Sequence, residues 1–314
     1  MTKMMLTLLL ASLSGGVVAQ PMAYSVNSDE PLGDTLHQLN LATGSATAIG
    51  TGVSAFGVVR KDIEGLAIAS DLSLWGIDES FPMSLFRINT TNGTVIQESD
   101  RSVSGLDSSE SNDFGLTFTC DGTLYASSVV SQSLFTLSEE GVATRVGNAG
   151  SLGVNISAIA SYGANPVRLF GLGNGLLGDE GPADNRSLYE IDPATGTTTL
   201  IGEIGPTVAD YSQAGLSFDA EGNLWAITDR SQTGQFSQII RLDIETGAGT
   251  VIANTTVMGF ESLAIGPPGG CSPVQPQPPF QDTKPIPTLG TLGHWLAFLA
   301  LMITGLIATR QRLA

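Results

Sequence analysis

Variants of one segment, Leu188–Gly202 with the sequence LYEIDPATGTTTLIG, recur along the chain and indicate its fold. Two apolar, alternating segments flank the turn DPATG, in which proline presets φ and glycine provides the exit from the turn. Related stretches begin at Leu36, Leu85, Leu134 and Ile239. The sequence therefore predicts one type of β-hairpin in five copies.

A second motif alternates with this hairpin. AGLSFDAEGNLWAIT, from Ala214, has counterparts that begin at Glu64 and Phe114 and weaker forms that begin at Ile156 and Glu261. Each reads as a strand, a tight Asp/Gly turn and a second strand, so the two motifs together give four strands per repeat. The hairpin glycines, at positions 44, 93, 141, 196 and 247, lie 49, 48, 55 and 51 residues apart. These intervals are close to the spacing of β-propeller blades, about 40–50 residues.

The two ends of the periodic region predict how the ring closes. The region begins with three strands of a repeat, in MAYSVNS, DTLHQLN and SATAIG, and ends with a lone first strand, FESLAIG from Phe260. Pairing this strand with the first three would complete a blade and remove exposed sheet edges. An open β-solenoid is the alternative, but it would require polar caps and gives no reason to split a repeat.

We therefore expect an all-β, five-bladed β-propeller of four-stranded blades over residues 20–266, closed by pairing of its N- and C-terminal strands. The repeat resembles the propellers built from LYxIDPxTGxxTxIG units in many exported bacterial proteins, and the match spans roughly residues 22–266. This resemblance implies an architecture and leaves the function open, because propellers carry many functions.

The N-terminus has the pattern of a secretory signal peptide. Lys3 precedes an apolar run from Met4 to Leu13, and Val17-Val18-Ala19 provides the small-residue cleavage pattern. An apolar run of about ten residues is too short to cross a membrane. We expect residues 1–19 to be removed and the rest of the chain to be exported.

The C-terminal part changes character twice. Residues 267–285 are rich in proline and predict an extended linker. Leu292–Thr309 then forms an 18-residue segment without acidic, lysine or arginine side chains, followed by Arg310 and Arg312. This order predicts a transmembrane helix with the two arginines on the cytoplasmic side. A plain membrane anchor is one interpretation of residues 286–314.

The tetrapeptide Ile286-Pro287-Thr288-Leu289, placed before the helix and the arginines, resembles the IPTL-CTERM sorting signal, a relative of PEP-CTERM tails. The resemblance implies a Gram-negative origin and an exosortase-like sorting enzyme as partner, with at least transient contact with the inner membrane. It also implies removal of the tail, as happens to a GPI signal. The protein would then reach the outer envelope or cell surface, or be released; as an anchored protein it would face the periplasm.

Composition excludes some functions and leaves the cysteines open. The net charge of −17, from 30 acidic and 13 basic residues, would repel nucleic acid. The only histidines are His37 and His294, so no histidine-based triad fits within the propeller. Cys120 and Cys271 either form a disulfide, which an exported protein permits, or remain two free thiols.

Polar residues precede or begin each predicted innermost strand, and a propeller would bring them to one mouth of its channel. They are Asp62, Glu64, Asp113, Asn155, Gln213 and Glu261. Oxygen ligands of this kind suit Ca²⁺, and Glu64, Asp113, Asn155 and Glu261 are the metal-ligand candidates. EGLAI and AGLSFDAEGNLWAIT also resemble the strand entries of calcium-dependent lactonase-type propellers, which implies metal ligands there. A solvated polar rim without a cofactor is the alternative.

Two functions follow from these patterns. The first is a non-enzymatic binding or structural module at the cell envelope, without a cofactor and with an unknown envelope or extracellular ligand. The second is a Ca²⁺-dependent hydrolase or lactonase, in which Glu64 and Glu261 are the carboxylates expected to act. Stabilisation by metal would separate the two functions.

Overall fold

The computed structural model describes residues 23–28, 34–80, 82–106, 112–175 and 185–271. The chain divides into two units, Met1–Ser272 and Pro273–Ala314, and every described residue lies in the first. The predicted signal peptide, most of the linker and the IPTL-type tail lie outside the described residues. Among the residues that are described, no helix has the length and apolar character needed to span a membrane.

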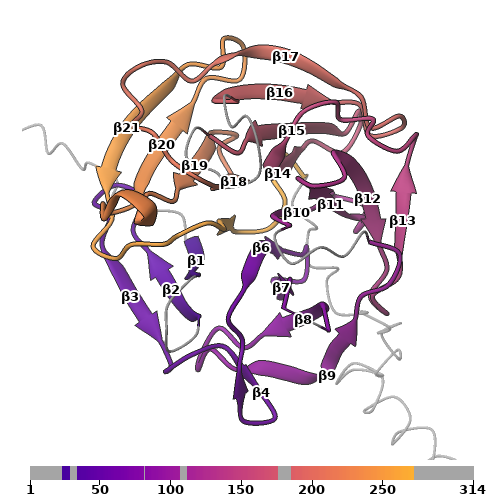
Figure 1. The fold of residues 1–314 in the computed structure, drawn as a ribbon, viewed down its shortest axis with the longest axis vertical. Coiled ribbons are helices and arrows are strands. Elements are labelled where there is room, and N and C mark those ends of the chain that lie inside the picture. The colour runs from indigo at the N-terminus through magenta and orange to yellow at the C-terminus, as the bar shows by residue number, and fades with distance from the viewer. Residues whose placement is uncertain (1–22, 29–33, 81, 107–111, 176–184, 272–314) are drawn as a thin grey trace, which may run out of the picture. The chain divides into compact units, whose positions relative to one another are not determined.

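The described chain forms five four-stranded antiparallel sheets, arranged as the blades of a propeller (Figure 1). Blade one combines β22 (Ala264–Ile265) with β1 (Ala23–Asn27), β2 (Thr35–Leu39) and β3 (Ala46–Ile49). Blade two contains β6 (Ile63–Ile68), β7 (Leu74–Asp78), β8 (Ser84–Ile88) and β9 (Val95–Ser102). Blade three contains β10 (Phe114–Phe118), β11 (Leu124–Ser128), β12 (Ser133–Leu137) and β13 (Ala143–Val146).

The remaining blades follow the same order from the inside outward. Blade four contains β14 (Ile156–Tyr162), β15 (Arg168–Gly173), β16 (Ser187–Ile191) and β17 (Thr198–Glu203). Blade five contains β18 (Ala214–Phe218), β19 (Leu224–Thr228), β20 (Gln238–Leu242) and β21 (Gly249–Asn254). A small hairpin of β4 (Ser54–Ala55) and β5 (Val58–Val59) connects blades one and two, and a 3-10 turn, η1 (Ser231–Thr233), follows β19. The predicted five-bladed, all-β fold is confirmed.

The first strands of the blades form the inner ring. Each contacts the first strand of the next blade, in the order β6, β10, β14, β18, β22 and back to β6. These strands lie near the centre of Figure 1, and the last strands lie at the periphery. Every residue of β10 is buried, whereas β13, the last strand of the same blade, has none that is fully buried. The apolar core lies between the facing sheets of neighbouring blades, mainly on their first three strands.

The inner strands approach closely because a small residue occupies their second position in the repeated motif. A Cβ atom on Gly215 of β18 would lie 2.3 Å from the backbone nitrogen of Leu263, just before β22. The four equivalent positions carry glycine or serine: Gly65, Gly115, Ser157 and Ser262. The repeated glycine or serine is thus explained by packing, because a larger side chain would push two blades apart.

The ring closes as the split repeat predicts. Ala23 pairs with Ile265 and Tyr24 with Ala264 in antiparallel register, and an isolated bridge joins Asn27 to Phe260. The last strand of the periodic region is therefore hydrogen-bonded to the first. This pairing removes the open edges that a linear array of blades would leave.

The predicted turn chemistry is also confirmed. In the β16–β17 hairpin, the side-chain Oδ1 of Asp192 accepts a hydrogen bond from the backbone N–H of Ala194 at 2.8 Å. Gly196 has φ of 69°, a conformation that other residues rarely adopt. In the β18–β19 turn, Asp219 Oδ1 accepts from the N–H of Asn223 at 2.8 Å.

Cys120 and Cys271 form a disulfide that spans 151 residues of sequence. Cys120 lies in the turn between β10 and β11. Cys271 follows β22 near the end of the described chain. The structure thus contains the disulfide-bonded alternative of the two that the sequence allows.

Candidate functional site: the acidic mouth

The inner strands begin at one mouth of the central channel, and four of the predicted site residues meet there. Glu64 is the second residue of β6, and Asp113, Gln213 and Glu261 lie just before β10, β18 and β22. Gln213 donates a hydrogen bond from Nε2 to Asp113 Oδ1 at 2.5 Å, and Glu261 lines the same cavity as Glu64. We call this end of the channel the acidic mouth.

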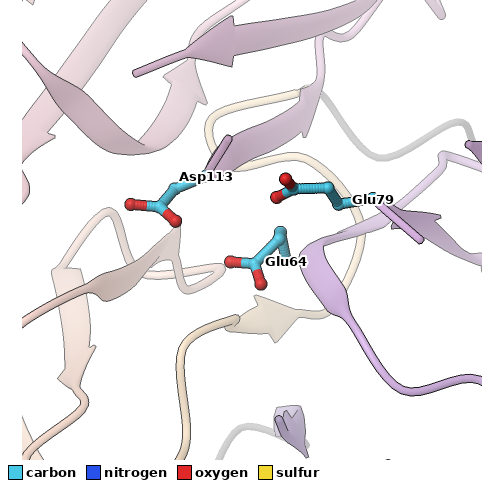
Figure 2. A group of neighbouring side chains, drawn as sticks. All are labelled: Glu64, Glu79 and Asp113. Atoms are coloured by element: carbon cyan, nitrogen blue, oxygen red, sulfur yellow. The ribbon is translucent and has the colours of Figure 1, made fainter. Parts of the chain in front are cut away.

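Three carboxylates at the acidic mouth form a compact group. Glu64, Glu79 and Asp113 each offer an oxygen, and these oxygens lie within 4.8 Å of one another. The three side chains are almost fully buried, with 6%, 8% and 6% exposure. Figure 2 shows the three carboxylates around a common space, with Glu64 and Glu79 supplied by blade two and Asp113 by blade three.

Glu79 is the member of this group that the sequence analysis did not identify. It follows β7, the second strand of its blade, whereas the predicted rim residues all lie at the start of first strands. Because β7 runs antiparallel to β6, it ends where β6 begins, and the Glu79 N–H donates to the carbonyl of Asp62 at 2.9 Å. The acidic pair Asp78-Glu79 at the predicted end of that strand was the available signal.

The electrostatics of the group favour the uptake of positive charge. Burial, followed by the negative charges of Glu261, Asp113, Asp62 and Glu79, raises the pKa of Glu64 well above its ordinary value. A carboxylate in this position is stabilised by a proton or by a cation. The group can therefore act as an acid, as a base or as a set of cation ligands.

Hydrogen bonds fix two of the three carboxylates. Asp113 accepts from Gln213, as described above, and Glu79 Oε1 accepts from the backbone N–H of Asn112 at 2.5 Å. The second amide atom of Gln213, Oε1, is buried without a hydrogen-bond partner among the described residues. Gln213 Oε1 is therefore a hydrogen-bond acceptor without a partner in the described chain, on a side chain that is itself bonded to Asp113.

A cavity of about 10 Å³ lies in the channel next to this group. Its walls include Glu64, Glu261 and Ser157, which is only 3% exposed and whose Oγ has no partner within the described chain. A space of this size holds about one water molecule. Pockets for drug-sized ligands occupy roughly 300 Å³ or more, so this cavity fits a water molecule or an ion.

The donor set fits a hard divalent cation. The mouth and cavity offer carboxylate oxygens from Glu64, Glu79 and Asp113, an amide oxygen from Gln213 and a hydroxyl oxygen from Ser157. Such oxygens are the ligands that Ca²⁺ uses. The acidic group could therefore hold a metal ion. Chemically, the same atoms could also hold a proton, because Glu64 has a raised pKa.

Two residues from the sequence analysis take other roles. Asn155 accepts a hydrogen bond on Oδ1 from Gln132 Nε2 at 2.7 Å, so the atom expected to bind metal is engaged within the protein. His37, the one histidine within the predicted propeller, is buried at 6% exposure and packs edge-on against Phe260, with ring centroids 5.2 Å apart. Burial lowers the pKa of His37, which suits a neutral packing residue.

Comparison with known proteins identifies no family and finds only solved structures of low similarity. No protein-family model matches the chain, and no curated protein matches it. A protein of unknown function from Bacteroides caccae is similar to it with a TM-score of 0.48 and 10% identity, over 78% of this chain and 98% of that one. Virginiamycin B lyase from Staphylococcus aureus gives a TM-score of 0.40 and 16% identity, over 74% and 70%.

A further protein of unknown function, from Bacteroides thetaiotaomicron, gives a TM-score of 0.43 and 16% identity over 66% of this chain and 53% of that one. At such identities a likeness concerns the arrangement of strands and carries no information on activity. The class that the structure itself defines is a five-bladed β-propeller with four-stranded antiparallel blades.

Proposed function

We propose that this protein is an exported β-propeller that acts as a binding or structural module at the cell envelope. In this proposal, residues 1–19 direct export, and residues 286–314 anchor the protein in the inner membrane or are read by an exosortase-like sorting enzyme. The ring of blades is the part presented outside the cytoplasm.

The Cys120–Cys271 disulfide is the structural observation that supports this proposal most directly. Disulfides persist in oxidising compartments and are rare in a reducing cytoplasm. A disulfide that joins the end of the propeller to its third blade therefore fits a domain that works after export. The signal-like start and the IPTL-type tail point in the same direction from the sequence.

The test is the intact mass of the protein isolated from its native envelope, measured with and without reduction before thiol alkylation. We expect a chain that lacks residues 1–19 and takes up alkyl groups only after reduction. Loss of everything beyond the Ile286 region would support sorting, and a mass that retains Arg310 and Arg312 would support a membrane anchor. A full-length chain with two free thiols would contradict the proposal.

A second candidate function is Ca²⁺-dependent hydrolysis at the acidic mouth, favoured by the buried group of Glu64, Glu79 and Asp113. The carboxylates and the Gln213 Oε1 atom would hold the ion, which would supply Lewis-acid chemistry when bound. Glu64, with its raised pKa, and Glu261, which lines the same cavity, would be the groups available to move a proton.

Metal binding can be tested separately from catalysis. If Ca²⁺ binds only the folded protein, a concentration about 100 times its Kd should stabilise it by about 2.7 kcal/mol over EDTA. Glu79→Gln should abolish this gain, whereas Glu139→Gln, an exposed residue in the β12–β13 turn, should retain it. Equal melting temperatures in EDTA and in millimolar Ca²⁺ would exclude this candidate. A metal-dependent shift without lactone hydrolysis would leave a structural cation site.

A further inference from the structure

The channel has a second mouth, where the inner strands end. The strand ends there are apolar, in contrast to the carboxylates of the acidic mouth. The last residues of four of these strands are Ile68, Phe118, Phe218 and Ile265. All four line one cavity of about 20 Å³ together with Pro268 and Gly269, which follow β22. The chain beyond the closing strand therefore lies across this mouth instead of leaving the propeller directly.

The segment from Gly266 to Cys271, which we call the clasp, contacts blades four and five. The N–H of Gly163, at the end of β14, donates to the carbonyl of Gly269 at 2.9 Å. Tyr162 and Gly269 also form an isolated parallel bridge. A Cβ atom on Gly269 would lie 2.5 Å from the Cβ of Phe218, so the clasp backbone is packed directly on the end of β18.

The disulfide then fixes the clasp to blade three. Cys271 is the last residue of the clasp, and its partner Cys120 lies in the β10–β11 turn. By contrast, β22 holds only two residues, and its ladder with β1 consists of the pairs Ala23–Ile265 and Tyr24–Ala264. Before β22, only the isolated Asn27–Phe260 bridge and the hydrogen bond from the Ser28 N–H to the Gly259 carbonyl, at 2.9 Å, extend the backbone contact among the described residues. The closing strand is thus short, whereas the segment that follows it is anchored on three other blades.

We propose that the clasp is a lock for the ring, which prevents the short closing strand β22 from separating from β1. Since the chain continues from Cys271 into residues 272–314, a pull on the tail would act first on the disulfide in blade three. It would reach the two-residue pairing of β22 only if that disulfide were broken. This resistance to a pull on the tail rests on the proposed anchoring or sorting of the tail; the lock itself does not.

This role differs from the general effect of a disulfide. A cross-link between distant residues stabilises a protein mainly by restricting its unfolded state, which reduces exchange from every region that opens only by global unfolding. A lock also suppresses a local opening of the native protein. The two effects can be separated by measuring which amides gain exchange when the cross-link is removed.

The experiment is native-state hydrogen exchange, followed by mass spectrometry, on the purified protein with Cys120→Ser/Cys271→Ser and with the wild-type cysteines. We expect peptides covering β1 and β22 to exchange at least about tenfold faster in the variant under conditions far from global unfolding. Peptides covering β7 and β11 should follow global stability alone. An equal change in all of these peptides would overturn the proposal, because the disulfide would then act only on the unfolded state.

A second variant keeps the disulfide and guards against misfolding of the first. Gly269→Val would displace the clasp from Phe218 while leaving both cysteines in place. We expect the same selective gain of exchange in β1 and β22. Gly202→Val serves as the control, because it crowds the backbone of the outer strand β17, where an added Cβ would lie 2.2 Å from the carbonyl oxygen of Thr246, away from the clasp. Unchanged exchange in β1 and β22 of the Gly269→Val protein would contradict the lock. Both experiments use the purified protein in solution, where nothing pulls on the tail, so their outcome is independent of whether the tail is sorted.

Discussion

The two mouths of the channel are built from opposite ends of the same strands. One mouth is lined by buried carboxylates, and the other is covered by a segment of the chain. At the acidic mouth, Glu64, Glu79 and Asp113 are buried together, and hydrogen bonds from Asn112 and Gln213 hold Glu79 and Asp113. At the other mouth, apolar strand ends are covered by a glycine-containing backbone segment that a disulfide holds in place.

The two mouths contribute to folding stability with opposite signs. Buried carboxylates of like charge oppose folding unless a proton or a cation neutralises them. Apolar packing and a long-range cross-link favour folding without any such condition. In a strand such as β6, the end at Glu64 favours folding only when its charge is neutralised, whereas the end at Ile68 favours folding under all conditions. We therefore expect ligands and pH to act on the acidic mouth.

The largest expected effect comes from breaking the clasped mouth. Cys120→Ser/Cys271→Ser should lower the free energy of unfolding by about 2–5 kcal/mol, because the disulfide closes a long loop in the unfolded chain. Urea unfolding of oxidised wild type and of the variant measures this. Reduced wild-type protein is the control and should match the variant. A loss below about 0.5 kcal/mol would mean that the disulfide contributes little to stability.

A smaller effect is expected at the acidic mouth as the pH changes in EDTA. The folded-state pKa of Glu64 is raised, so the folded protein binds its proton more tightly than the unfolded chain. Glu64 therefore favours folding at pH values below the unfolded pKa of about 4.3. This contribution is lost as the pH rises from there through the folded pKa.

Glu64→Gln should flatten this part of the stability profile and leave the protein relatively more stable at high pH. Urea unfolding at several pH values between about 4.5 and 8 tests this, with Glu139→Gln as the matched surface control. Parallel profiles for wild type and Glu64→Gln would show that Glu64 titrates alike in the folded and unfolded states. That result would weaken the contrast between the two mouths.

The smallest expected effect concerns the β4–β5 hairpin, which precedes the acidic-mouth strand β6. Phe56 is 73% exposed and has φ of 51°, a left-handed conformation that costs a non-glycine residue about 1–2 kcal/mol. Phe56→Asn should stabilise the propeller by up to about 1 kcal/mol, because Asn-Gly suits a two-residue hairpin. Thermal unfolding measures this. A destabilised variant would indicate that the phenyl ring makes contacts worth more than the strain.

The sequence predicted the architecture well because its signals are local. Turns such as that at Asp192 and Gly196 are fixed by residues a few positions apart, and their recurrence gave the number of blades. The split repeat predicted that the strand after Phe260 would pair with the N-terminal strands, as observed between Ala264–Ile265 and Ala23–Tyr24. The candidate site was predicted in part, since Glu64 and Asp113 do meet.

What the sequence by itself determined is therefore the propeller, its five blades and the end of the channel at which polar residues gather. Hairpin period, turn residues and strand order are enough for these features, because each depends on neighbours in the chain. Only the tertiary structure decided that Glu79 joins Glu64 and Asp113, that Asn155 turns to Gln132, and that Cys120 meets Cys271. These contacts join different strands, and all but the Glu64–Glu79 contact join different blades. They depend on how the closed ring and the clasp bring distant residues together, which no local pattern encodes.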